Sequence, residues 1–219
     1  MNTMTEHMPT YLPPEALLAD YACGAVSPGV SLLVSAHLAK AQQSAATVAR
    51  FEAIAGALIV DDQAAEIAPS SLNAVLSRLD AEDDLSPRSL EAGPLPQPLI
   101  DAVGTDFNKI PWRFALPGLS EHILKDFSGE DEEVSLLRGR PGVRIPQHTH
   151  EGEEMTLVLT GALQDGGRIF RAGDIALNDE NDDHKPRIVG TEICHCLVVN
   201  TGRLRFTGPL SRALNLLGE

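Results

Sequence analysis

The feature that most restricts the fold of this chain is the stretch GVRIPQHTHEGEEMTLVLTG at residues 142–161. Residues two apart in a β-strand point to the same face, so the side chains of His148 and His150 are expected to project together. Glu151 and Gly152 are good turn residues, and a hairpin at this point would bring Glu154 opposite the two histidines. Two imidazoles and a carboxylate can bind a divalent metal ion. The pattern therefore predicts a β-hairpin that carries three metal ligands.

The spacing within this stretch resembles the first cupin motif, and five residues meet its intervals: Gly142, His148, His150, Glu154 and Gly161. The resemblance implies a β-barrel in which a later hairpin supplies the last metal ligand. His184 follows turn residues at Gly173 and Asp174 and is assigned that role, although this interval is longer than in the common second cupin motif. Without the resemblance, an HxH pair is also compatible with a solvated turn, and His184 with a surface loop.

Composition narrows the class of protein. The chain has 219 residues and a net charge of −14, with no cluster of Lys and Arg to neutralise phosphates, so direct DNA binding is not expected. The sequence shows neither an apolar run of about 18 residues nor a signal peptide, so we expect a cytoplasmic protein without a membrane span. The three cysteines, Cys23, Cys194 and Cys196, do not form a disulfide framework, and the last two are expected to be small buried hydrophobes.

The chain changes character near residue 80. Residues 1–80 predict four helices, whose apolar residues recur every three or four positions, for example at Val48, Phe51, Ile54 and Leu58. Residues 81–98 hold four prolines and a charge cluster and are interpreted as a linker. From residue 99 to residue 219, short apolar runs alternate with Gly, Pro, Asn and Asp, which is typical of an all-β sandwich or barrel. We therefore predict a multidomain α + β protein, with a small helical bundle followed by a cupin-like jelly roll.

The resemblance extends to a regulatory family. The segments HTHEGEEMTLVLTGAL, GRIFRAGDI, CHCLVVNTGRLRFTG and SRALN are similar to the C-terminal half of ChrR-type anti-sigma factors. The helical first half and the linker fit the same architecture. The resemblance implies that the N-terminal helices bind an extracytoplasmic-function sigma factor, and that the cupin-like half is needed for the response to oxidative stress. It also favours zinc as the metal, while the ligand set alone would suit iron, manganese or nickel as well.

The helical half departs from its family at a second zinc motif. His7 and His37 match the two histidines of that motif, but Ala41 and Ser44 stand where the family has cysteines. Alanine cannot bind a metal, and serine is a poor zinc ligand beside thiolate. We therefore expect no structural zinc in this half, with His7 at a cap or on the surface and His37 within a helix.

These observations leave two functions in view. The first is an anti-sigma factor with one divalent metal held by His148, His150, Glu154 and His184 and no catalytic activity. The alternative is a cupin metalloenzyme, a dioxygenase or isomerase, whose helical half serves dimerisation. The whole-chain resemblance and the absence of an evident second set of acid–base residues favour the regulator. Whether the chain forms a homodimer is left open.

Overall fold

The computed structural model describes residues 8–60, 63–81 and 90–208, so that His7 and the last eleven residues lie outside it. The helical half contains α1 (Glu15–Ala22), α2 (Pro28–Leu38), α3 (Gln42–Val60) and α4 (Ser71–Ala81). These four helices confirm the prediction for this half. Helix α2 begins where the sequence indicates, because Ser27 Oγ accepts a hydrogen bond from the backbone N–H of Val30 and Pro28 occupies the first turn.

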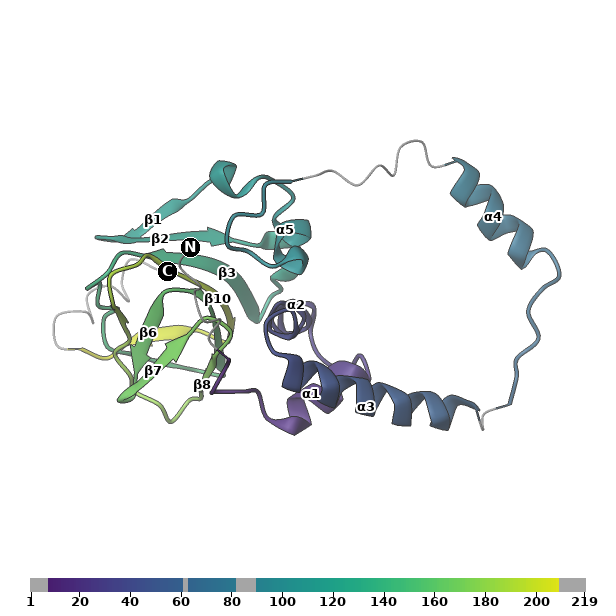
Figure 1. The fold of residues 1–219 in the computed structure, drawn as a ribbon, viewed down its shortest axis with the longest axis horizontal. Helices are drawn as coiled ribbons and strands as arrows, with labels where there is room; N and C mark the ends of the chain where they lie inside the picture. Colours follow the sequence, from purple (N-terminus) through teal and green to yellow (C-terminus); the bar gives the residue numbers. More distant parts are fainter. Residues whose placement is uncertain (1–7, 61–62, 82–89, 209–219) are drawn as a thin grey trace, which may run out of the picture.

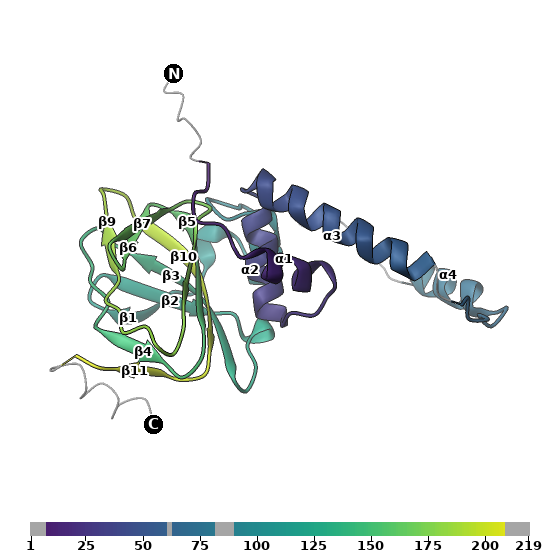
Figure 2. The same ribbon diagram turned by 90° about the horizontal axis from the view of Figure 1, so that it is seen from below.

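Helices α1, α2 and α3 pack together against one face of the β half (Figures 1 and 2). Helix α2 is buried on most of its surface, with Leu33 and Val34 fully inaccessible. Helix α3 is buried only in its first half, around Val48. Ile54 and Leu58, which continue the apolar spacing of α3, are 58% and 71% exposed. The reason is that α3 extends beyond the body of the protein, where no other described element covers it (Figure 2).

Helix α4 lies apart from the other helices and from the β half (Figure 1). Its apolar residues Leu72, Val75 and Leu76 fall at helical spacing and are 68%, 55% and 47% exposed. A surface helix usually buries such a stripe against its own protein. Among the described residues, nothing covers the stripe of α4.

The part of the predicted linker that the structure describes is packed against the body. Leu95 is buried, and it is followed by helix α5 (Gln97–Val103), whose Leu99 and Ile100 join the same core as α2. Short 3₁₀ helices η1 (Phe107–Lys109) and η2 (Lys125–Phe127) flank the first hairpin of the β half. The domain boundaries themselves stay a prediction.

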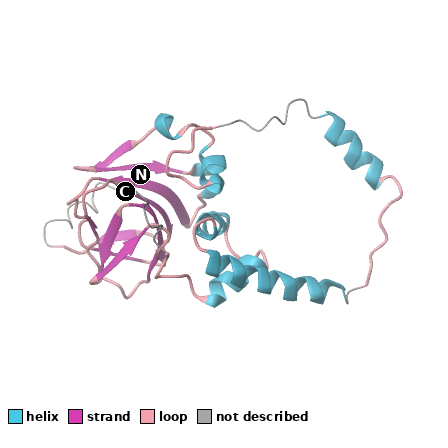
Figure 3. Ribbon diagram, viewed as in Figure 1, coloured by secondary structure: helices cyan, strands magenta, loops and turns pink. Residues whose placement is uncertain are grey.

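The β half is built from antiparallel strands in three sheets, which Figure 3 shows on the side opposite the helices. The large sheet has the order β1-β2-β3-β10-β5-β8, and the two small sheets have the orders β7-β6-β9 and β11-β4. The strands are β1 (Arg113–Leu116), β2 (Leu119–Ile123), β3 (Glu132–Gly139), β4 (His148–His150), β5 (Glu154–Thr160), β6 (Ala162–Asp165), β7 (Arg168–Arg171), β8 (Ile175–Asn178), β9 (Arg187–Val189), β10 (Cys194–Thr201) and β11 (Leu204–Phe206). The predicted fold class, helices followed by an all-β half, is confirmed.

The large sheet separates two apolar cores, because alternate residues of a strand face opposite sides. On β10, Leu197 and Val199 point toward the helices and pack with residues of α1, α2 and α5. Cys196 and Val198 point the other way, into the space between the sheets. The helices therefore cover the outer face of the large sheet, and the small sheets close over its inner face.

The two halves meet at the turn 171–174 between β7 and β8, which we call the junction turn. The Asp174 carboxylate is buried and accepts hydrogen bonds from the backbone N–H groups of Thr10, Tyr11 and Arg171. The carbonyl oxygen of Gly173 accepts a hydrogen bond from Nδ1 of His37 on α2, at 2.8 Å. A single turn thus holds both the start of the described chain and the second helix.

Candidate metal centre

The predicted hairpin was wrong, because β4 pairs with β11 whereas β5 pairs with β10 and β8, but the short connection between the two strands still places the three polar residues in the interior. His148 and His150 begin and end β4 and both point inward, with relative exposures of 2% and 3%. Glu154 is the first residue of β5 and is also buried. The second glycine of the motif, Gly161, has φ +69°, and a Cβ there would lie 2.9 Å from the Cα of Cys194. Only glycine fits this close approach, because a side chain would collide with the neighbouring strand.

Backbone pairing with His148 brings the side chain of His184 to the same cluster. The N–H of His148 bonds to the carbonyl oxygen of His184, and the N–H of His184 bonds to the carbonyl oxygen of His148, both at 3.0 Å. Directly paired residues of an antiparallel bridge project their side chains to the same side. The long interval after Gly173 therefore does not prevent His184 from joining the other three residues.

The four side chains form one compact buried cluster. Glu154 Oε2 lies 3.6 Å from His150 Nε2 and 3.9 Å from His148 Nε2, and Glu154 Oε1 lies 3.9 Å from His184 Nε2. His150 Nε2 and His184 Nε2 are 3.0 Å apart. One donor atom from each residue lies within 4.8 Å of every other. The structure thus brings together all four residues that the sequence assigned to the site.

Two neighbours fix the orientation of the imidazoles. The carbonyl oxygen of Pro146 can only accept a hydrogen bond, so it takes the Nδ1 proton of His148 at 2.8 Å and leaves the Nε2 lone pair facing the cluster. Asp165 Oδ2, 2.7 Å from His184 Nδ1, does the same for His184. A carboxylate or carbonyl behind a histidine is the usual support of a metal ligand. No sequence signal pairs Asp165 with His184.

The electrostatics of the cluster favour ionised carboxylates. Burial opposes the ionisation of Glu154, but the three neighbouring imidazoles lower its pKa overall. Burial lowers the pKa of His150. Burial also opposes the charged form of His184, but the hydrogen bond that it donates to Asp165 and the charge of Glu154 raise its pKa above the ordinary value. The cluster therefore concentrates negative charge and imidazole lone pairs at one buried point.

The donor set fits a divalent metal ion. Bonds of about 2.0–2.1 Å to a tetrahedral ion place neighbouring ligand atoms about 3.3 Å apart, close to the separations of 3.0–3.9 Å in this cluster. His150 Nε2 and His184 Nε2, 3.0 Å apart, can share one proton in a hydrogen bond or both direct lone pairs at a bound cation. The cluster is therefore able to bind a metal ion, and its ligand types accept several metals.

The altered zinc motif of the helical half has a different structure. Ser44 Oγ lies 2.8 Å from His37 Nε2, and Ala41, Ser44 and His37 are all buried. Because the Gly173 carbonyl takes the Nδ1 proton of His37, Nε2 accepts the hydrogen bond and the Ser44 hydroxyl donates it. Burial lowers the pKa of His37, which favours this neutral form. A hydrogen bond thus joins two positions of the zinc motif, whereas His7 lies outside the described residues.

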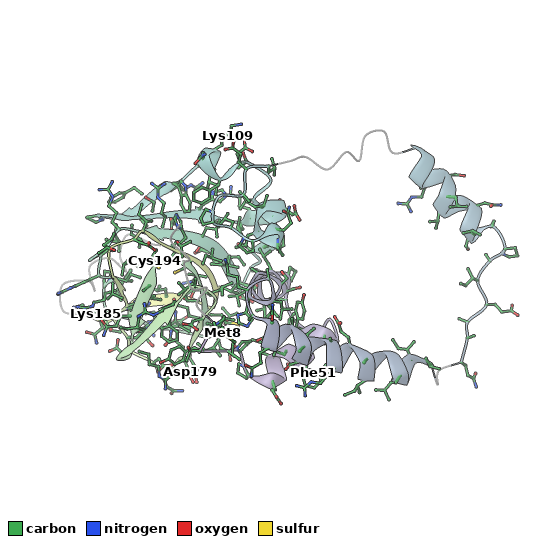
Figure 4. The ribbon with its side chains drawn as sticks, viewed as in Figure 1. Met8, Phe51, Lys109, Asp179, Lys185 and Cys194 are labelled. Atoms are coloured by element: carbon green, nitrogen blue, oxygen red, sulfur yellow. The ribbon has the colours of Figure 1, made fainter. Side chains whose placement is uncertain are left out.

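The paired cysteines of β10 are buried in the β half, where Figure 4 shows Cys194. Their sulfur atoms are 3.6 Å apart, and the side chains are 1% and 3% exposed. The hydrogen bond with Cys194, together with burial, raises the pKa of the Cys196 thiol well above its ordinary value. Both thiols therefore pack as small apolar groups, as predicted, whereas Cys23 is exposed.

Comparison with known proteins assigns the chain to a family. Residues 101–205 match the family described as the ChrR cupin-like domain. The anti-sigma-E factor ChrR of Cereibacter sphaeroides is 33% identical over 199 residues, which cover 90% of this chain and 92% of that protein. This chain belongs to the ChrR family. Its β half is accordingly a cupin, as the spacing of the first motif predicted.

The similarity to ChrR includes the three-dimensional structure. A chain in the crystal structure of Rhodobacter sphaeroides SigE in complex with the anti-sigma ChrR matches with a TM-score of 0.74 and 32% identity. The match covers 87% of this chain and 98% of that chain. The arrangement of helical half and cupin half is therefore shared with a solved relative. None of the described helices is both long enough and apolar enough to span a membrane.

Proposed function

We propose that this ChrR-family protein is a cytoplasmic anti-sigma factor that binds an extracytoplasmic-function sigma factor through its N-terminal helices. The observation that carries the proposal is the uncovered apolar surface of α3 and α4. Ile54, Leu58, Ile59 and Val60 on α3 are at least 58% exposed, and three residues of α4 are at least 47% exposed. Apolar patches of this kind mark protein interfaces. The relative solved with SigE supplies the class of partner.

The charge of the helical half agrees with such a partner. Residues 1–80 contain eight acidic and three basic residues. A negative rim around an apolar stripe steers a basic surface toward it and raises the association rate. Sigma factors bind DNA and therefore carry basic surfaces. The apolar stripe would supply most of the binding affinity, and the acidic side chains would mainly raise the association rate.

The α4 stripe allows a direct test with a matched control. Leu76→Asp places a charge in the stripe and should weaken binding of the partner sigma factor from the same host by about 2 kcal/mol or more, which is at least about thirtyfold in Kd. Ser77→Asp adds the same charge at an exposed neighbouring position and should change Kd by less than about threefold. Titration calorimetry with the purified proteins measures both. Equal affinities for the two variants would exclude α4 from the interface.

We also propose that His148, His150, Glu154 and His184 hold a zinc ion. The ion would join β4, β5 and the segment before β9, so that its binding free energy stabilises the cupin half. The chain's own contribution is the orientation of His148 and His184 by Pro146 and Asp165. In this proposal the cupin half is needed for release of the sigma factor under oxidative stress, as the family resemblance implies.

The double variant His148→Ala with His150→Ala tests the metal site. Two remaining ligands do not hold the ion against water, so metal per chain should fall from about one to nearly zero. Inductively coupled plasma mass spectrometry of the purified protein gives this number and identifies the metal. His122→Ala, on β2 outside the cluster, is the matched control and should retain full metal content. Equal metal in the double variant and the wild type would refute the ligand assignment.

A catalytic role is not proposed. The alternative of a cupin dioxygenase or isomerase predicted turnover of a small molecule, with the helices serving dimerisation. The identity with an anti-sigma factor runs through both halves, and exposed apolar residues on two helices fit an interface with another protein. Turnover by the metal-loaded protein, together with failure to bind any sigma factor of the host, would restore the alternative.

A further inference from the structure

The cupin half contains a cavity beside the metal cluster, and the proposed metal ligands His148 and Glu154 are part of its lining. Its volume is about 600 Å³, within the range of small-molecule sites in proteins. The large sheet forms one wall, and residues of β6, β9, β4 and β11 and of the loops beside them form the opposite wall. Most of the lining is apolar, including Leu137, Val198, Leu163 and Ile188. Such a lining suits the hydrocarbon part of a ligand.

Three polar groups of the cavity, Glu133, Asn200 and Glu154, form a row across the sheet, and Ser135, Thr156 and His148 are further polar residues of the lining. Asn200 on β10 pairs in register with Glu133 on β3 and with Glu154 on β5, so the three side chains lie side by side on the inner face of the sheet. All three line the cavity, and so does Glu121 on β2. The cavity is therefore amphipathic, with an apolar body and an acidic edge.

One of these groups lacks a hydrogen bond. The amide oxygen of Asn200 is buried, and no donor among the described residues lies within hydrogen-bond distance of it. A buried acceptor without a donor is costly, and a bound molecule that donates a hydrogen bond removes this cost. A ligand in the cavity that donates a hydrogen bond would therefore satisfy the amide oxygen of Asn200.

The nearby charges determine which head group would be accepted. Glu121 and Glu133 both present carboxylates to the cavity, and burial together with the charge of Glu133 raises the pKa of Glu121. A second anion would suffer the same repulsion as these two carboxylates exert on each other. A hydroxyl or an ammonium group would instead donate hydrogen bonds to the row.

We propose that the cavity binds a small molecule with an apolar body and a hydrogen-bond-donating head, an alcohol or an amine, and discriminates against the corresponding carboxylate. The head lies at the row formed by Glu133 and Asn200, and the body lies against Val198 and Leu163. The proposal is independent of the sigma factor, because the cavity lies on the inner face of the sheet and the helices lie on its outer face.

The test uses the full-length, metal-loaded protein and three probes that differ only in the head group: 4-phenylbutanol, 4-phenylbutylamine and 4-phenylbutyrate. Isothermal titration calorimetry should show binding of the alcohol and the amine, with the carboxylate about tenfold weaker or more. Absence of binding by the alcohol and the amine at millimolar concentration would overturn the proposal. Preferential binding of the carboxylate would overturn it as well, since it would indicate an anion held at the metal.

Two variants locate the site. Val198→Phe fills the cavity and should weaken the alcohol by about tenfold, with folding checked by circular dichroism. Glu133→Gln changes an exposed side chain, so folding should be retained, and it should reduce the preference for amine over carboxylate by at least about threefold. Glu130→Gln, an exposed carboxylate outside the cavity lining, is the control and should leave all three affinities unchanged. An unaltered head-group preference in Glu133→Gln would refute the proposed position of the head.

Discussion

One contact between the two halves is made by a buried carboxylate, and replacing it should loosen the start of the described chain while the apolar core beneath the helices remains. Asp174 is 1% exposed and accepts three backbone hydrogen bonds, from Thr10 at 2.6 Å, Tyr11 at 3.0 Å and Arg171 at 2.7 Å. Hydrogen bonds to a charged group contribute about 1.5–3 kcal/mol each. Because the three share one acceptor and are not additive, we expect Asp174→Ala to lower the free energy of unfolding by about 3–5 kcal/mol.

Asp179→Ala is the matched control for this change. Asp179 lies just beyond the other end of β8, is exposed, and accepts a bond from the nearby N–H of Asn181 at 2.8 Å. Loss of this side chain should lower the free energy of unfolding by about 1 kcal/mol or less. Urea unfolding at constant pH gives both values, provided that the slopes of the two transitions agree.

Hydrogen exchange shows where the Asp174→Ala variant loosens. The amides of Thr10 and Tyr11 should lose protection together with those at the end of α2, because His37 bonds to the same junction turn. The amides of β5 should keep most of theirs. A variant that unfolds within about 1 kcal/mol of Asp179→Ala, with residues 10–11 still protected, would refute the role of Asp174.

Two further predictions concern histidines outside the metal cluster. Wild-type protein should bind no second equivalent of zinc. Ala41→Cys with Ser44→Cys should create a chelator-sensitive second site near His37, provided that His7 lies within reach. A second zinc ion that the unmodified protein binds and that His37→Ala removes would contradict this prediction. Burial, with Arg138 nearby, lowers the pKa of His195 to about 4. Because the unfolded chain binds a proton at this histidine at a higher pH than the folded protein does, the free energy of unfolding should fall as the pH drops from about 6.5 to 4. His195→Gln should remove about 2 kcal/mol of that loss between pH 7 and 4.5, measured by urea unfolding. An identical pH dependence of stability in His195→Gln and in the wild type would be inconsistent with a buried neutral His195.

The metal cluster could be predicted from the sequence to the extent that its geometry is local. His148, His150 and Glu154 lie within seven residues of sequence, and the two-residue period of a strand together with the short connection from β4 to β5 brings them together, although the two strands pair with different partners. His184 required a family pattern, because the bridge to His148 joins segments more than thirty residues apart. Asp165 could not be inferred at all, since its role appears only when β6 lies behind the ring of His184.

In the helical half, the sequence predicts the helices but not which of their residues are buried. The periodicity of α3 correctly predicts a helix with an apolar face, but it does not say what covers that face. Val48 is buried against the other helices, whereas Ile54 and Leu58, on the same stripe, are 58% and 71% exposed. The sequence also gives no sign that His37 bonds to Gly173, which comes from the other half of the chain. Hydrophobic periodicity thus describes one element, and burial depends on what that element meets.

Strand β8 explains why the junction turn and the metal cluster form together. Ile175 follows Asp174 directly and faces the helices, and Ala176 faces the cavity side. At the other end of the strand, Asn178 pairs in register with Glu154. A slip of one residue between β5 and β8 would exchange the two faces, drive Ile175 inward and carry Asp174 away from the N–H groups of residues 10 and 11. The register that sets the strand beside Glu154 is therefore the same register that attaches the helical half, and neither contact can be shifted alone.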